Sequence, residues 1–79
     1  MKNSPALTKM NEKLATQSDA QLINLFITSE SIQDEIEITN PRYKECTIVK
    51  VCIEQELVRR HGEEGREMIE ALCEELDAA

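Results

Sequence analysis

The most apolar part of the chain lies between Cys46 and Val58. Two stripes with helical spacing run along it: Cys46, Val49, Ile53 and Leu57 form the first, and Ile48, Val51, Cys52 and Val58 form the second. A helix at the surface of a globular protein normally has one apolar face. The doubled stripe therefore predicts a helix that is central in a bundle or lies at a contact between subunits.

Two shorter helices are predicted before this segment. A Ser-Pro pair begins the first, which covers residues 5–16 and has a narrow apolar stripe. Ser18 and Gln21 have the spacing of a capping box, in which two orphan backbone donors are satisfied reciprocally. This box and the apolar run behind it predict a second helix over residues 19–28.

The pattern between residues 29 and 39 allows two interpretations. Ile32 and Ile36 have helical spacing, whereas Ile36 and Ile38 alternate with glutamates, as in an edge strand. We expect a short helix followed by an extended piece.

Two helices are predicted in the C-terminal half. Asn40 and Pro41 are a helix start, Gly62 is a C-terminal cap, and the segment between them predicts a helix over residues 41–61. The cations in its last turn, Arg59, Arg60 and His61, complement the negative helix end. Lys50 with Glu54, and Glu56 with Arg60, have the spacing of ion pairs on its exposed side. A further helix over residues 63–77 should fold back as an antiparallel hairpin, with an inner face made of Met68, Ile69, Leu72, Cys73 and Leu76.

These elements predict an all-α fold, a small four-helix domain covering residues 1–79, with a frayed terminus at residues 1–3. The chain has 79 residues, no tryptophan, one phenylalanine and one tyrosine, so its core must be aliphatic. A core this small is marginal alone and is commonly supported by a partner subunit. We therefore expect a homodimer, with these residues in the core or at the dimer contact: Phe26, Val49, Ile53 and Leu57.

The charge and the cysteines restrict the environment. The formal net charge is −7, which repels nucleic acid and anionic membranes and favours solubility or a basic partner. The three cysteines, an odd number, lie in apolar helical patterns, as expected for reduced structural thiols. No apolar run like that of a signal peptide follows the first residues, and no stretch approaches the length of a membrane span, so we expect neither. We expect a cytoplasmic protein that does not bind membranes.

The sequence offers little for catalysis. The cysteines and His61 lack the close spacing of zinc ligands, and the two glycines cannot build a phosphate-binding loop, so neither metal nor cofactor is expected. A bundle this small also leaves little room for a substrate pocket. A small enzyme that uses a Cys–His pair is the third-ranked interpretation.

A DNA-binding regulator that acts as a dimer is the alternative. Residues 35–76 can be threaded as strand, helix and helix, an order that resembles ribbon-helix-helix repressors. The strand would present Glu35 and Glu37 where base recognition needs basic or amide side chains. The basic residues form no continuous stripe, so binding of nucleic acid is not the favoured interpretation.

The most distinctive remaining feature is acidic. Steps of four, three, four and three residues place five acids on one face of the last helix: Glu63, Glu67, Glu70, Glu74 and Asp77. Like charges at this spacing repel, and acids near a helix C-terminus are unfavourable. The favoured function is therefore a non-catalytic adaptor, inhibitor or regulatory subunit whose acidic face binds a protein with a basic surface. The other interpretation of this face is a solvated surface.

Overall fold

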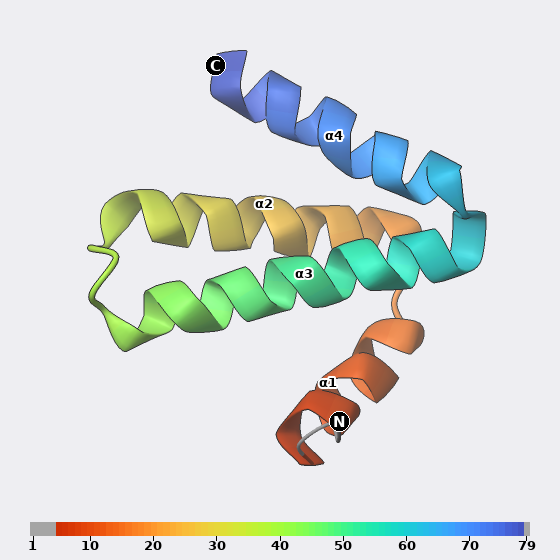
Figure 1. The fold of residues 1–79 in the computed structure, drawn as a ribbon, viewed down its shortest axis with the longest axis horizontal. Helices are drawn as coiled ribbons and strands as arrows, with labels where there is room; N and C mark the ends of the chain where they lie inside the picture. The colour runs from red at the N-terminus through yellow and green to blue at the C-terminus, as the bar shows by residue number, and fades with distance from the viewer. Residues whose placement is uncertain (1–4, 79) are drawn as a thin grey trace.

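The described part of the chain is all-helical, as the sequence predicts. The computed structural model describes residues 5–78, which contain four helices and no strand (Figure 1). The predicted frayed terminus at residues 1–3 and the Ser4 cap lie outside the described residues. The helices are α1, Pro5–Ala15; α2, Asp19–Glu35; α3, Pro41–His61; and α4, Glu63–Ala78.

The helix boundaries follow from local side-chain chemistry. The Ser18 hydroxyl accepts from the Gln21 amide at 3.1 Å, and the Gln21 side chain accepts from the Ser18 amide at 2.8 Å. The predicted capping box is thus confirmed. Asn40 Oδ1 accepts from the Arg42 amide at 2.9 Å, directly before the helix that begins at Pro41. At the other end of α3, Gly62 has a φ of 65°, and its amide donates to the Val58 carbonyl at 2.7 Å.

The expectation for residues 29–39 is right in part. Residues 29–35 are helical, as expected, but they continue α2 without a break instead of following a helix that ends near residue 28. The backbone of Ile36 is extended, with φ −122° and ψ 161°, but no strand forms in residues 36–39. Residues 36–40 make a turn in which the Ile38 side chain is 75% exposed. The helix continues because Ser29 and Gln33 extend its buried face beyond Leu22 and Phe26. These two side chains are polar, so hydropathy alone does not show that face.

A buried amide joins α2 to α3. The two helices run side by side in opposite directions (Figure 1). Gln33 Nε2 donates to the Tyr43 carbonyl at 2.8 Å and to Thr47 Oγ1 at 2.7 Å. Because an unpaired buried amide is costly, these bonds favour one register of the α2–α3 pair.

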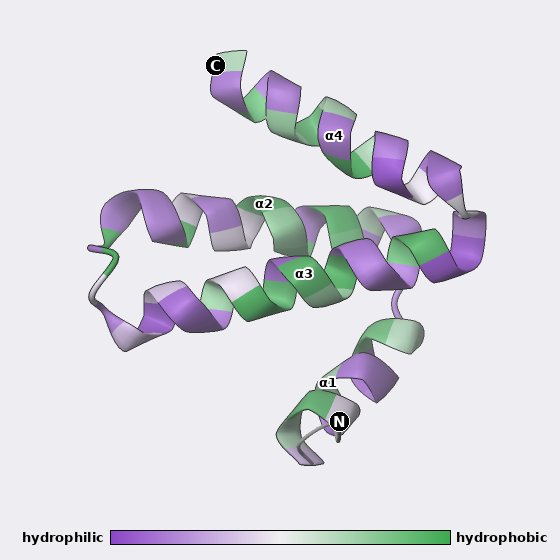
Figure 2. Cartoon of the chain, viewed as in Figure 1, coloured by the Kyte–Doolittle hydropathy of each residue, from purple (hydrophilic) through white to green (hydrophobic). Residues whose placement is uncertain are grey.

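The core is built around the middle of α3, where hydrophobic residues concentrate (Figure 2). Of the four expected core or dimer residues, Phe26, Ile53 and Leu57 are buried within the single chain, and Val49 is half-buried against them. Cys52 and Ile69 complete the centre, while α1 contributes Leu14. Half-buried residues of the expected inner face of α4 pack against this cluster: Met68, Leu72, Cys73 and Leu76.

The backbones of α3 and α4 come close together at Gly65. After Gly62 the chain turns back, and α4 diverges from α3 toward the C-terminus (Figure 1). Gly65 is buried, and a Cβ atom built on it would lie 2.3 Å from the Leu57 carbonyl oxygen. The two backbones can therefore meet here only because position 65 lacks a side chain.

Candidate functional site

The five acids of the predicted face lie together on the outside of α4. All of them are exposed, whereas Ile69 on the opposite side of the helix is buried in the core: Glu63, Glu67, Glu70, Glu74 and Asp77. Within residues 5–78 the only ion pair of this face joins Glu63 Oε1 to Arg66 Nε at 3.6 Å. The acidic face is thus a row of carboxylates of which four have no cationic partner in the described part of the chain.

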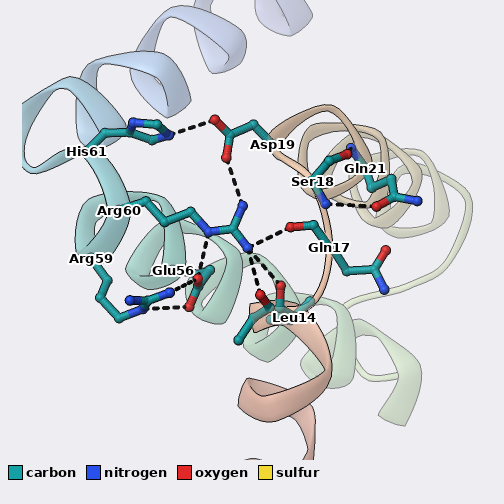
Figure 3. A network of polar contacts seen from close by, with 10 residues as sticks. Leu14, Gln17, Ser18, Asp19, Gln21, Glu56, Arg59, Arg60 and His61 are labelled. Atoms are coloured by element: carbon teal, nitrogen blue, oxygen red, sulfur yellow. Dashed lines mark hydrogen bonds and ion pairs between the residues drawn. The ribbon is translucent and has the colours of Figure 1, made fainter.

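A polar network that the sequence analysis missed is centred on Arg60 (Figure 3). Arg60 Nη1 donates to Asp19 Oδ1 at 2.9 Å, and Nε donates to Glu56 Oε2 at 2.7 Å. Nη2 donates to three backbone carbonyls at and beyond the end of α1, with distances of 3.2 Å to Leu14, 3.3 Å to Ala15 and 2.6 Å to Gln17. Arg60 was expected to complement the end of its own helix. It instead caps α1 and ties three helices together.

Neighbouring charges complete this network. Arg59 Nε donates to Glu56 Oε1 at 3.1 Å, and His61 Nε2 lies 2.6 Å from Asp19 Oδ2. Hydrogen bonds from Arg60 and then His61 lower the pKa of the Asp19 carboxyl. The pKa of Glu56 is also lowered, chiefly by its hydrogen bond with Arg59, against an opposing effect of burial.

Both ion pairs expected on the exposed side of α3 need correction. Glu56 does pair with Arg60, but the Glu56 side chain is only 9% exposed, because α1 and α2 approach this part of α3. Lys50 pairs with Glu30 of α2 in place of Glu54, and its ammonium group lies 5.6 Å from the centre of the Phe26 ring. The Lys50–Glu30 pair therefore joins α3 to α2. The Glu56–Arg60 pair lies within α3, at the point where Arg60 also contacts α1 and α2.

The thiols and His61 are not arranged as an activated pair. All three cysteines are free; Cys46 and Cys52 are buried and Cys73 is half-buried. Burial raises the pKa of Cys52 and of Cys73, which is opposite to the shift that produces a reactive thiolate. Within residues 5–78, no group of three or more His, Cys, Asp or Glu side chains is placed to hold a metal ion.

A groove lies between α1 and the α2–α3 pair, where the sequence analysis expected little room. Its volume is about 450 Å³. Helix α1 lines it with Met10, Lys13, Leu14 and Gln17, and α2 lines it with Leu25, Ser29 and Ile32. Helix α3 adds Arg42, Glu45, Cys46 and Val49. No short motif marks this groove, because its walls come from three separate helices.

Comparison with known proteins adds no family to this description. No protein-family model, curated protein or solved structure matches the chain. The function must therefore be argued from the geometry.

The strand needed for the resemblance to ribbon-helix-helix repressors is not present, because residues 19–35 are helical and residues 36–40 form a turn. None of the helices in residues 5–78 has the length and apolar character needed to span a bilayer.

Proposed function

We propose that this protein is a non-catalytic binding module whose acidic face engages a basic surface of another protein. The observation that carries the proposal is the exposed row on α4, in which Glu67, Glu70, Glu74 and Asp77 have no cationic partner within residues 5–78. Adaptor, inhibitor and regulatory-subunit roles all use such a contact. A basic partner would supply the counter-charges that this part of the chain lacks.

Electrostatics supports a role in recognition more than in stability. Each pair of like charges at helical spacing costs a few tenths of a kcal/mol, and Glu74 and Asp77 also lie near the negative end of α4. A cationic partner relieves both effects. Charged contacts of this exposed kind mainly raise the association rate and make binding sensitive to salt.

We also propose that the protein forms a homodimer and that α3 and α4 form a helical hairpin. Phe26, Ile53 and Leu57 are covered within one chain, so a second copy would need other apolar residues. Ile48 and Val51 of α3 are 39% and 46% exposed and lie three residues apart, on one side of the helix. Light scattering over micromolar concentrations tests the dimer: a constant 9.0 kDa particle would refute it.

The free thiols support a reducing, cytoplasmic location.

Charge substitution tests the acidic face. Changing Glu67, Glu70 and Glu74 to glutamine raises the formal net charge from −7 to −4 and preserves side-chain size. The matched control changes three exposed acids elsewhere, Asp34→Asn, Glu35→Gln and Glu37→Gln, and gives the same net charge.

Quantitative affinity capture should compare the wild-type protein with both variants, and the recovered binding protein should then be titrated. We expect the α4 variant to lose the partner and the control to keep it, with a loss that resembles the effect of high salt. If the purified partner bound both variants with unchanged affinity at low salt, the row would be a solvated surface only.

A further inference from the structure

The groove between α1 and the α2–α3 pair has the scale of a small-molecule site. Its volume of about 450 Å³ lies within the usual range for ligand pockets. Its floor includes side chains that are almost fully covered, with exposed fractions of 3% for Leu14 and 8% for Cys46. The groove is therefore open to solvent at its edges, where Leu25 is 39% exposed, and has a covered floor.

The lining divides into an apolar body and a charged rim. Six apolar side chains provide the body: Met10, Leu14, Leu25, Ile32, Cys46 and Val49. The charged residues are Lys13 from α1, and Arg42 and Glu45 from α3. The groove thus has a formal charge of +1 in a protein whose net charge is −7.

The two cations of the groove, Lys13 and Arg42, form no ion pair with another side chain in residues 5–78. Of the eight lysines and arginines in residues 5–78, four form ion pairs: Lys50, Arg59, Arg60 and Arg66. Lys13 and Arg42 form none within this range, and neither pairs with the neighbouring Glu45. An arginine can bind a carboxylate with two parallel hydrogen bonds, and a lysine can bind it as a point charge.

One further polar side chain, Ser29, lies among the apolar residues of the groove. Ser29 is 4% exposed and lines the groove, and its hydroxyl makes no hydrogen bond within residues 5–78. Every fully covered side-chain nitrogen or oxygen in the described part of the chain has a partner, so the Ser29 oxygen is not sealed in the core.

From these features we propose that the groove binds a small amphipathic anion, with a single flexible apolar chain and a terminal carboxylate, as in a medium-chain fatty acid. The apolar chain occupies the body of the groove between α1 and the α2–α3 pair. The carboxylate is held at the rim by Lys13 or Arg42, and Glu45 opposes it. This site is distinct from the acidic face of α4.

Decanoate is the probe, and ¹⁵N-labelled protein reports binding by NMR. We expect saturable shifts at amides that line the groove, and binding at least tenfold weaker for decyltrimethylammonium, which reverses the charge. Lys13→Met and Arg42→Gln should each weaken decanoate binding by about twofold to fivefold, the range of an exposed ion pair. Glu45→Gln should strengthen it by about twofold.

Lys44→Gln is the matched control, since Lys44 is exposed near Arg42 but does not line the groove. Leu25→Gln, at a side chain that is 39% exposed, tests the apolar body without emptying the core and should weaken binding. The proposal is overturned if the cationic probe binds as well as decanoate, or if Lys44→Gln weakens binding as much as Arg42→Gln. It is also overturned if the shifts do not saturate, or if a second copy covers the groove and decanoate does not bind.

Discussion

Replacement of Gly65 by alanine is the sharpest test of the packing of α4 on α3. Alanine is the better helix former by about 1 kcal/mol, so helix propensity alone predicts a more stable protein. The packing predicts the opposite. The new Cβ would lie 2.3 Å from the Leu57 carbonyl oxygen, 2.5 Å from its carbon and 2.7 Å from the Val58 nitrogen. These are backbone atoms, so no change of rotamer can relieve the contact.

The expected loss of stability follows from the distance by which α3 and α4 must move apart to make room for the new Cβ. Optimal contacts between such atoms lie near 3.5 Å, so the helices must separate by roughly 1 Å. Overpacking of this kind costs typically 1–3 kcal/mol, and a clash between backbones belongs at the upper end, about 3 kcal/mol. Subtracting the gain in propensity leaves a net loss of about 2 kcal/mol. For a domain of this size that loss lowers the Tm by about 8–16 °C.

Urea and thermal unfolding followed by circular dichroism at 222 nm measure the effect. Ala71→Gly is the matched control, since Ala71 is exposed in the same helix and reports propensity without a clash. We expect the control to lose about 1 kcal/mol. If Gly65→Ala stabilised the protein by the same amount, α3 and α4 would not meet as described, and the placement of the acidic face would have to be revised.

Three further predictions concern other parts of the fold. The carboxyl pKa values of Asp19 and Glu56 are lowered by their arginine partners. The ionised carboxylates therefore stabilise the fold at any pH above the ordinary pKa of such groups, which is about 4. This contribution is lost as the pH falls through the lowered values, and urea midpoints measured between about pH 6 and pH 3 should decline less in Arg60→Gln than in the wild type. Cys52 should react slowly with a thiol reagent in native protein and rapidly in denaturant, because burial raises its pKa; equal rates would contradict its position in the core. Ile38→Gln should change the free energy of unfolding by less than about 0.5 kcal/mol, whereas a loss above 1 kcal/mol would mean that this side chain is covered.

The parts of the fold that local chemistry determines could be predicted from the sequence. The Ser18 box, the Asn40 cap and the turn at Gly62 depend on side chains within a few positions of the backbone groups they satisfy. The burial of polar side chains could not be predicted in this way. Ser29 and Gln33 lie on the inner face of α2, and the partners of Gln33 are ten and fourteen residues away along the chain.

Of the candidate sites, the acidic face could be predicted from the sequence, whereas the Arg60 network and the groove could not. The acidic face is a property of one helix, so residue spacing places its five members on one side before any packing is known. The role of Arg60 depends on the position of the end of α1, more than forty residues earlier in the chain. The groove depends on three helices at once, and its unpaired cations can be recognised only when the pairs made by the other cations are known.

The attachment of α1 has a consequence for motion. This helix packs mainly against α3 and contributes one buried side chain, Leu14, to the core, and its C-terminal carbonyls are held by Arg60. Because little buried surface secures it, α1 should open by local unfolding while α2 and α3 remain paired. Its backbone amides should then exchange with deuterium earlier than those of α3. The groove beside α1 would exist only in the closed form, so a ligand bound there would slow that exchange by a factor of one plus the ratio of its free concentration to its Kd.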